Sequence, residues 1–529
     1  MSNHKGELSK KRLHISKVVF SLSAIAVFTK IFGFAEKLVV AHFFGTAASA
    51  DVYFASMGII LSIVFLVKEL IYPSLLPVFA ETLSMSPDAS VTLFKKVFIR
   101  AVFILTVFAT GIALFSDSFT KVLVPGFSEN KQQVTSVMLR YLAPACLFLS
   151  LSTITYAVLN CRKRFLQAAL PEAGLKFFIV VGLIALAPFL GIYALAVVVT
   201  LGATFVFLIQ LYFIPESRNL LRYNSYKADN ELPKVLKLMG PLVIGVVFSR
   251  ISGLVDNILA STLPTGHLSY LAYSKKLIDA VLLIGPVALV TVVYSQLAHL
   301  SSEQNQEDFK GLFIKVIRLI LYVSVPTTLL LVSLREPFIN VLFERGKFTV
   351  ESTSGTSQGL FVYGIGLVTF SLETLIVYTF YARSDTKTPV KIGIFGVCLD
   401  IILAVAFLKP FGFIGIAWAF VISKTVKVLV LLSVMERKLI FLQGSGLASF
   451  VPKLTVAALV SAFILQLLTG MENRNTFVHT TFFGLVIPAT GFLSVFLLCS
   501  YLLRIDELKQ LITVLLSKKP KYRLVGEKV

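Results

Sequence analysis

Charged residues are scarce in this chain of 529 residues, because Asp, Glu, Lys and Arg together make up only 15% of it. Ordinary globular proteins carry about 25%. Hydrophobic residues make up 56% of the sequence, and a water-soluble domain cannot present that balance to solvent. The scarcity of charge therefore excludes a soluble enzyme or a soluble binding domain and indicates a membrane protein.

Cysteine is also rare, and the four that occur (Cys146, Cys161, Cys398 and Cys499) form no CxxC pair. Neither a metal centre nor a disulfide framework is indicated, so we interpret them as small core residues. The sequence contains no Walker loop, no dinucleotide fingerprint after a strand and no HExxH motif. A GxSxG pattern at 355–359 enters an apolar span, whereas a nucleophile elbow needs a strand–turn–helix context. We therefore expect no enzyme activity and no direct use of ATP, so ion gradients, the membrane potential or downstream consumption must drive any work.

The sequence instead contains fourteen apolar stretches, each about 20 residues or longer and thus long enough to span a bilayer as a helix. They fall near residues 17–44, 51–79, 92–116, 133–159, 166–188, 190–214, 233–262, 268–298, 309–333, 353–382, 388–408, 411–435, 449–470 and 479–503. Connections rich in Lys and Arg alternate with others, of which those around 46–49, 188–191 and 264–266 are short and carry neither, while the loop 335–351 is mixed in sign. The positive-inside rule then places both termini on the cytoplasmic side, as an even number of spans requires. The predicted fold class is an all-α integral membrane protein with fourteen transmembrane helices.

The formal net charge of +21 would suggest a nucleic-acid partner if the protein were soluble. In a membrane protein, the positive-inside rule and attraction to anionic lipid headgroups explain this charge better. We therefore expect membrane lipids, and no nucleic acid, as partners.

The longest polar cytoplasmic connection, from Pro215 to Glu231, separates six spans from eight and marks a boundary between two lobes. Pro or Gly interrupts several spans, and broken helices at membrane depth are tolerated where they line a cavity, so they favour a transporter. The predicted organisation is a cytoplasmic N-terminus (1–16), an N-lobe of six helices (17–214), a cytoplasmic inter-lobe loop (215–232), a C-lobe of six helices (233–435), two C-terminal helices (449–503) and an amphipathic basic cytoplasmic tail (504–529).

Charged residues inside the apolar spans indicate function, since an intramembrane charge is costly unless it faces water or a partner. Cations outnumber carboxylates among them, which suits an anionic headgroup, with phosphate the obvious candidate. The cations that we assign to the lining of a central cavity are Lys30, Arg250, Lys275 and Lys276. The alternative for a lysine near the end of a span is that its side chain snorkels to the interface, and this covers Lys176, Lys424 and Lys427.

A second group is expected to form ion pairs at a gate, and it consists of Glu36, Lys37, Asp51 and Asp279. Asp279 follows Lys275 and Lys276 at the i+3/i+4 spacing that brings helical side chains together. Glu36 and Asp51 bracket the outer end of the first hairpin, where carboxylate–cation contacts supply a closure that forms and breaks. Lys275 and Lys276 are the candidate partners of Asp51 in such a gate. The alternative is that Asp51 caps the N-terminus of its own helix.

Several blocks of the sequence resemble the MurJ/MviN family of lipid II flippases, which belongs to a superfamily with the MATE exporters and the Wzx polysaccharide flippases. The most specific blocks are ERGKF at 344–348 and TKTP at 386–389. Others are KIFGFA at 30–35, AHFFG at 41–45, ADVYF at 50–54 and LPVFAE at 76–81. The resemblance runs from about Lys17 to the end of the fourteenth predicted span.

This resemblance implies two lobes around a central cationic cavity for a diphosphate-sugar headgroup, with a groove for the polyprenyl tail in the last two helices. It implies alternating access, by which lipid II is flipped from the inner to the outer leaflet of the bacterial cytoplasmic (inner) membrane. The implied partner is an undecaprenyl-diphosphate-linked sugar-peptide lipid, handled by a monomer that needs no cofactor. Lys30, Arg250, Lys275 and Lys276 would then bind the diphosphate.

The resemblance also suggests a coupling ion, because some members of the family are thought to hold Na⁺ between their seventh and eleventh helices. Asp256 and Asp400 are deep carboxylates in the corresponding spans of this chain. The candidate driving forces are therefore Na⁺ or the membrane potential. The alternative for both residues is hydrogen bonding to neighbouring Ser, Thr or backbone groups.

The chain departs from the family at charged positions. Lys30 and Glu36 stand where the family's first helix usually has arginines, and Lys275-Lys276 replaces an Asp-Arg pair. Arginine grips phosphate with two parallel hydrogen bonds, whereas lysine acts as a point charge. These departures bear on the identity of the substrate more than on the fold.

The nearest alternative function is a flippase for another polyprenyl-diphosphate-linked oligosaccharide, used for surface polysaccharide. A MATE-type cation antiporter would need a carboxylate-rich cavity, and the excess of lysine counts against it. An integral-membrane glycosyltransferase typically needs a large extracytoplasmic loop. The longest such loop here, about 335–352, is too short to house one.

Overall fold

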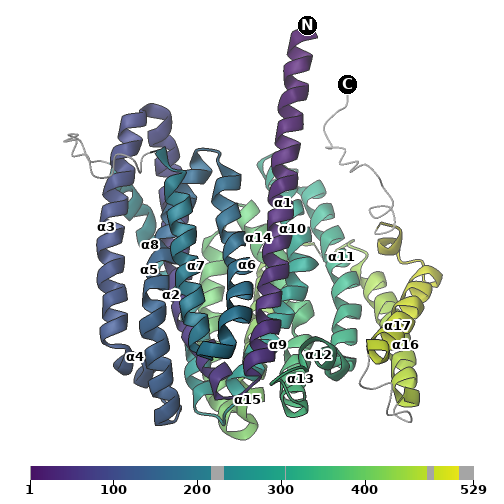
Figure 1. The fold of residues 1–529 in the computed structure, drawn as a ribbon. Coiled ribbons are helices and arrows are strands. Elements are labelled where there is room, and N and C mark those ends of the chain that lie inside the picture. The colour runs from purple at the N-terminus through teal and green to yellow at the C-terminus, as the bar shows by residue number, and fades with distance from the viewer. Residues whose placement is uncertain (1, 216–230, 304, 442, 473–481, 511–529) are drawn as a thin grey trace. The chain divides into compact units, whose positions relative to one another are not determined.

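The computed structural model describes residues 2–215, 231–303, 305–441, 443–472 and 482–510, most of which lie in helices (Figure 1). Within these ranges no strand occurs, which confirms the all-α fold class. In chain order the helices are α1 (Ser2–Phe44), α2 (Ala48–Met85), α3 (Pro87–Leu114), α4 (Ser116–Leu123), α5 (Glu129–Cys161), α6 (Phe165–Leu190), α7 (Tyr193–Tyr212), α8 (Glu231–Ser261), α9 (His267–Ile284), α10 (Pro286–Ser302), α11 (Gln306–Ser333), α12 (Arg335–Phe343), α13 (Val350–Ile365), α14 (Leu367–Ala382), α15 (Lys387–Leu439), α16 (Leu447–Glu472) and α17 (Phe482–Leu502).

Each predicted apolar stretch overlaps one or two of these helices. In the described part of the chain, nine helices are long and apolar enough to span a membrane, or twelve if each of three bent pairs counts as one span. Two of the fourteen predicted spans are not included in this number. One corresponds to α1, which is not among the nine helices. The other is one half of α15, which counts as a single helix although its backbone breaks at Gly412 (φ 58°). The helical membrane fold is thus confirmed, whereas the exact number of fourteen spans is not.

The predicted interruptions of spans by Pro and Gly occur only in part. Pro286 begins α10 after a bend of 40° from α9, Pro241 lies where the two parts of α8 meet at 51°, and Gly366 lies where α13 and α14 meet at 45°. For the other prolines the prediction is wrong, because they lie inside continuous helices, and membrane helices tolerate proline in this way. These are Pro73, Pro77, Pro144, Pro171 and Pro326.

The helices group into two compact units, and the first consists of Met1–Tyr273, Phe343–Ser352 and Ile401–Ile416. In this unit α2 packs against α5 and α8, α5 against α3 and α7, and α6 against α1 and α7. The core lies between α2, α3 and α5, where Phe79, Phe94 and Leu159 are fully buried. Helices that are apolar on all sides can bury one face in such a core and turn the other to lipid.

The second unit consists of Ser274–Leu342, Thr353–Asp400 and Ala417–Val529. In it α10, α11 and α14 pack against one another, and α11 also contacts α16 and α17. Phe313, Leu375 and Leu431 are fully buried in one core cluster, and Phe492 in another.

The predicted lobe boundaries stay a prediction. The two units divide the chain within α9, after Tyr273, whereas the prediction placed the boundary at the inter-lobe loop. Most of that loop (216–230) and most of the predicted tail (511–529) lie outside the described residues. The segment predicted as a separate N-terminus, 1–16, is continuous with α1 from Ser2 onwards. At the start of the tail, Glu507 is buried and pairs with Arg318 of α11 at 2.6 Å.

The structure also tests the interpretations of the cysteines and of the GxSxG pattern. Cys146 is buried, but Cys398 is exposed on α15, so the interpretation as a core residue is wrong for Cys398. Ser357 of the GxSxG pattern lies within α13 and donates a hydrogen bond to the carbonyl oxygen of Ser354. This helical context is not that of a nucleophile elbow.

Candidate functional site

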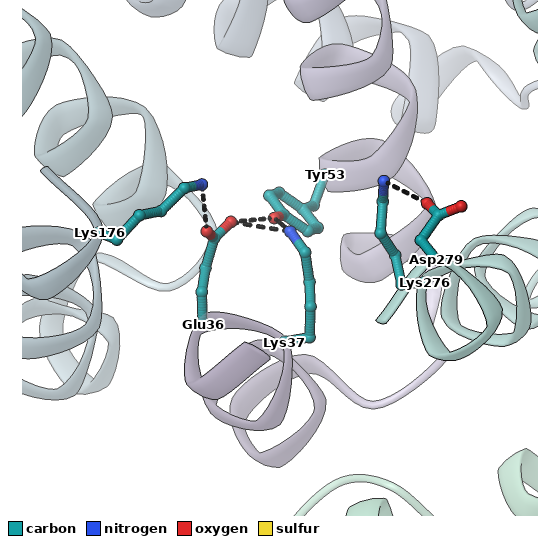
Figure 2. A network of polar contacts seen from close by, with 6 residues as sticks. All are labelled: Glu36, Lys37, Tyr53, Lys176, Lys276 and Asp279. Atoms are coloured by element: carbon teal, nitrogen blue, oxygen red, sulfur yellow. Dashed lines mark hydrogen bonds and ion pairs between the residues drawn. The ribbon is translucent and has the colours of Figure 1, made fainter. Parts of the chain in front are cut away.

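A buried carboxylate held by two lysines lies in the first unit, and we call it the Glu36 clamp (Figure 2). Glu36 of α1 is 1% exposed. Its Oε1 accepts hydrogen bonds from Lys37 Nζ and from the Tyr53 hydroxyl, each at 2.8 Å. Its Oε2 accepts a hydrogen bond from Lys176 Nζ, also at 2.8 Å. The clamp therefore consists of Glu36, Lys37, Tyr53 and Lys176, from α1, α2 and α6.

The charges of the Glu36 clamp do not balance, since two ammonium groups face one carboxylate. Lys37 also lies over the ring of Tyr53, 5.0 Å from its centroid, and a ring face attracts a cation without neutralising it. A buried carboxylate in this position would be very costly without its cations. The clamp therefore carries one positive charge in excess, which an anion or water can compensate.

Glu36 and Lys37 were expected at a gate, and Lys176 was interpreted as a snorkelling lysine. The structure shows Lys176 bonded to Glu36 instead. A signal was available in the sequence, because Lys176 lies about 11 residues, or ~16 Å of helix, from the nearer end of its span. A lysine side chain cannot cover that length to reach the interface.

Asp51 makes a second buried network in the first unit. It is 1% exposed and accepts hydrogen bonds from Lys131 Nζ at 2.8 Å, Gly266 N at 2.8 Å, and Ser269 N and Oγ at 3.0 and 2.6 Å. Gly266 and Ser269 lie at the start of α9, where free N–H groups and the helix dipole favour a carboxylate. Asp51 thus caps α9. It also stands in the first turn of its own helix α2, where a carboxylate is favoured, although α2 has no side-chain cap bond.

The partners of Asp51 also differ from those proposed for a gate. Lys131 of α5 holds its carboxylate, whereas Lys276 contacts Asp279 at 3.2 Å and Lys275 lies over the ring of Phe420 at 3.9 Å. Figure 2 also draws the pair Lys276–Asp279, which belongs to the second unit. Lys131 was missed because it stands at the start of its predicted span, where a lysine is expected in any case.

The α1–α2 junction packs against the segment that carries the ERGKF block, within the first unit. Lys347 N donates to the His42 carbonyl oxygen at 2.9 Å, and the hydroxyls of Thr46 and Ser352 lie 2.7 Å apart. Gly346 has φ +65°, and a Cβ there would lie 2.3 Å from the His42 oxygen, so only glycine fits. These contacts explain why the block needs glycine at 346, and we refer to them as the junction seal.

Arg250 of α8, predicted to bind diphosphate, forms an ion pair with Glu69 of α2. It borders a largely apolar pocket of about 560 Å³, lined by side chains of α2, α3, α4, α5 and α8. Lys30, assigned the same role, is exposed on α1. The diphosphate-binding role of these residues, and of Lys275 and Lys276, stays a prediction.

The predicted sodium residues lie in different units, Asp256 in the first and Asp400 in the second. Asp400 is buried and accepts a hydrogen bond from Ser423 Oγ at 3.2 Å, which agrees with the alternative of hydrogen bonding to a neighbouring Ser. Among the described residues, no three or more His, Cys, Asp or Glu residues are grouped so as to hold a metal ion. The sodium site stays a prediction.

Comparison with solved structures identifies the fold. A lipid II flippase MurJ in an inward closed conformation matches with a TM-score of 0.78 at 23% identity, covering 92% of this chain and 99% of that one. An inward-facing multidrug resistance MATE transporter matches with a TM-score of 0.68 at 13% identity, covering 79% of this chain and 96% of that one. The fold alone is thus shared by transporters of different substrates.

Comparison of sequences is more specific. A "Probable lipid II flippase MurJ" of Vibrio cholerae serotype O1 is 30% identical over 424 residues, which cover 77% of this chain and 80% of the relative. The family model described as "Lipid II flippase MurJ" matches residues 40–487, which is most of the sequence. The chain is therefore a multi-pass membrane protein that belongs to the lipid II flippase MurJ family.

Proposed function

We propose that this protein flips lipid II, the polyprenyl-diphosphate disaccharide-peptide precursor of peptidoglycan, from the inner to the outer leaflet of the bacterial cytoplasmic membrane. One observation carries the proposal: the match to the family of lipid II flippases extends over residues 40–487. We further propose that the protein works by alternating access as a monomer, with both termini in the cytoplasm.

The charged headgroup of lipid II is the part that cannot cross the bilayer unaided. A diphosphate cannot cross hydrocarbon unless cations or water replace its hydration shell. In this proposal Lys30, Lys275, Lys276 and Arg250 are those cations, and Asp51 with the junction seal belongs to the closure that separates the two leaflets. Because lysine binds phosphate as a point charge, the headgroup is held less rigidly than an arginine pair would hold it.

Complementation tests the function directly. The chain is expressed in a bacterial strain depleted of its own lipid II flippase, where we expect it to restore growth. Charge reversal of Lys30, Lys275 or Lys276 to Glu should abolish growth while the protein stays abundant in the membrane. Lys315→Glu, at an exposed position of α11, is the matched control and should grow normally. Normal growth of all three reversal variants would reject the assignment of these lysines.

The nearest alternative is a flippase for another polyprenyl-diphosphate-linked oligosaccharide. The observation that keeps it open is the Glu36 clamp, which places a carboxylate where the family usually has an arginine. Purified protein in liposomes distinguishes the two, with lipid II offered beside a polyprenyl-diphosphate oligosaccharide without a peptide. Faster translocation of lipid II supports the proposal, whereas faster translocation of the lipid without a peptide supports the alternative. Repeating the assay with and without Na⁺, in wild type and in the Asp256→Asn and Asp400→Asn variants, tests the sodium site.

A further inference from the structure

A second clamp lies in the other unit and contains residues that the proposed function does not yet use. Glu373 of α14 accepts hydrogen bonds from Lys424 Nζ at 3.0 Å and from Lys427 Nζ at 2.6 Å, both residues of α15. Both bonds end on the same carboxylate oxygen, Oε1. We call these three residues the Glu373 clamp.

The two lysines of the Glu373 clamp are too deep in their span to snorkel. Each lies about a dozen residues, or ~18 Å of helix, from the nearer end of the second half of α15, which runs from the break at Gly412 to Leu439. The interpretation of Lys424 and Lys427 as interfacial lysines is therefore wrong. A structural ion pair would need one lysine for one carboxylate, so the second lysine is a charge that only an anion or water can compensate.

A third ammonium group adjoins the clamp through an aromatic ring. Phe420 lies one turn before Lys424 on α15, and its ring contacts both Lys424, at 5.6 Å, and Lys275 of α9, at 3.9 Å. Within the described part of the chain, no carboxylate forms an ion pair with Lys275. Two cations therefore face one carboxylate within the second unit. A third, Lys275, adjoins them through the Phe420 ring and is already predicted to bind substrate.

The side chains of the clamp differ in accessibility in a way that suits exchange of partners. Lys424 is 30% exposed, whereas Lys427 is 16% exposed. The Glu36 clamp shows the same division, with Lys176 at 34% and Lys37 at 15%. In each clamp, one lysine is thus about twice as exposed as the other.

We propose that Lys424, Lys427 and Lys275 form an anion site for the phosphate groups of the lipid-linked substrate, and that Glu373 occupies this site when no phosphate is bound. Rotation of Lys424 from the carboxylate to a phosphate oxygen exchanges one charge-assisted hydrogen bond for another, so no ammonium is left bare. Glu373 then competes with the phosphate for the lysines and promotes its release. A transport site needs this, because it must bind its substrate tightly enough to load it and weakly enough to release it. The proposal rests on the proposed function only for the identity of the natural ligand.

Binding of inorganic pyrophosphate to the purified full-length protein in detergent, measured by calorimetry, tests the site without any lipid. We expect Lys424→Gln to weaken binding about tenfold, the usual effect of losing one charge-assisted hydrogen bond. Glu373→Gln should tighten binding by a similar factor, because it removes the competing carboxylate. Lys315→Gln is the matched control and should bind as wild type does. Equal affinity of all four proteins, or weaker binding by Glu373→Gln, overturns the proposal.

Glu373→Gln leaves two deep lysines without a counter-charge, so this variant could fail to fold. The double variant Glu373→Gln with Lys424→Gln removes one charge of each sign and keeps the test decisive. Relative to Lys424→Gln alone, we expect the double variant to bind pyrophosphate more tightly, and no gain contradicts the competition by Glu373. If pyrophosphate binds as expected but lipid II is not translocated, the anion site stands and the proposed function fails. If lipid II is translocated but the variants do not change pyrophosphate binding as expected, the proposed function stands and the anion site fails.

Discussion

Asp51→Asn is expected to destabilise the first unit by about 3–5 kcal/mol, the usual effect of removing one partner from a buried ion pair. The carboxylate of Asp51 accepts four hydrogen bonds, and an amide replaces one of its oxygens with a donor. In the more favourable orientation of the new amide, its NH₂ group faces Ser269, whose hydroxyl can rotate and accept a hydrogen bond from it. The Ser269 N–H is then left unsatisfied, at about 1–3 kcal/mol, and Lys131 loses its counter-charge.

Lys131→Met is the matched variant on the other side of the pair. It should destabilise the unit by only about 1–2 kcal/mol, because Asp51 keeps three hydrogen bonds and the favourable N-terminal end of α9. The double variant should be less unstable than the sum of the two single variants, by about 1–3 kcal/mol of coupling.

Unfolding of the purified proteins in detergent, followed by circular dichroism, measures these effects as shifts in the midpoint. Ser269→Ala serves as a control that removes one neutral hydroxyl and should cost about 1 kcal/mol. Equal shifts for Asp51→Asn and Lys131→Met, with an additive double variant, would refute the reasoning, since a coupled buried pair cannot behave in that way.

Three further predictions concern the junction seal and a loop beyond the spans. Gly346→Ala should lower stability by roughly 2 kcal/mol or more in thermal unfolding, because it combines a positive φ with a clash at 2.3 Å, whereas Gly174→Ala, with nothing within 4 Å, should be neutral or stabilising. Thr46→Cys with Ser352→Cys, in a background without the native cysteines, should form a disulfide that stops lipid translocation until a reductant is added; transport in the oxidised state would show that this contact does not open. The hydrogen bond from Lys438, with those from Thr388, lowers the pKa of Asp385 from 3.8 to about 2, against the opposing effect of burial. Asp385→Asn should therefore be less stable than wild type by about 1–2 kcal/mol at neutral pH, after allowance for solvent screening, and the difference should vanish as the pH falls from about 4 to 2.

The fold was largely predictable because each helix is encoded locally. An apolar stretch that must satisfy its backbone in lipid can only be a helix, and each of the fourteen predicted stretches overlaps one. The breaks were less predictable. Pro144 lies inside a helix, whereas Pro286 begins one after Gly285, whose backbone is not helical, so a Gly-Pro pair breaks the span where Pro alone does not.

The candidate site was predictable only where its charges are neighbours in sequence. Glu36 with Lys37, and Lys276 with Asp279, follow from adjacency or helical spacing. Lys131 lies 80 residues from Asp51 along the chain, so no periodicity connects the two. That pair depends on how α2 and α5 are rotated against each other. Side-chain packing over the whole unit determines this rotation. The distance of Lys176, Lys424 and Lys427 from the ends of their helices was a signal in the sequence that these lysines are not interfacial.

The preference for lysine over arginine in both clamps has a physical consequence for transport. An arginine beside a buried carboxylate forms two parallel hydrogen bonds in a fixed plane, and breaking that pair to admit a phosphate loses both at once. A lysine ammonium turns about a flexible stem and can keep one acceptor while it approaches another. In each unit the glutamate holds two such lysines, of which the more exposed one can move while the other keeps the carboxylate paired. The moving lysine thereby passes from the carboxylate to the phosphate without losing its counter-charge, and the barrier to this exchange stays low enough for the site to turn over.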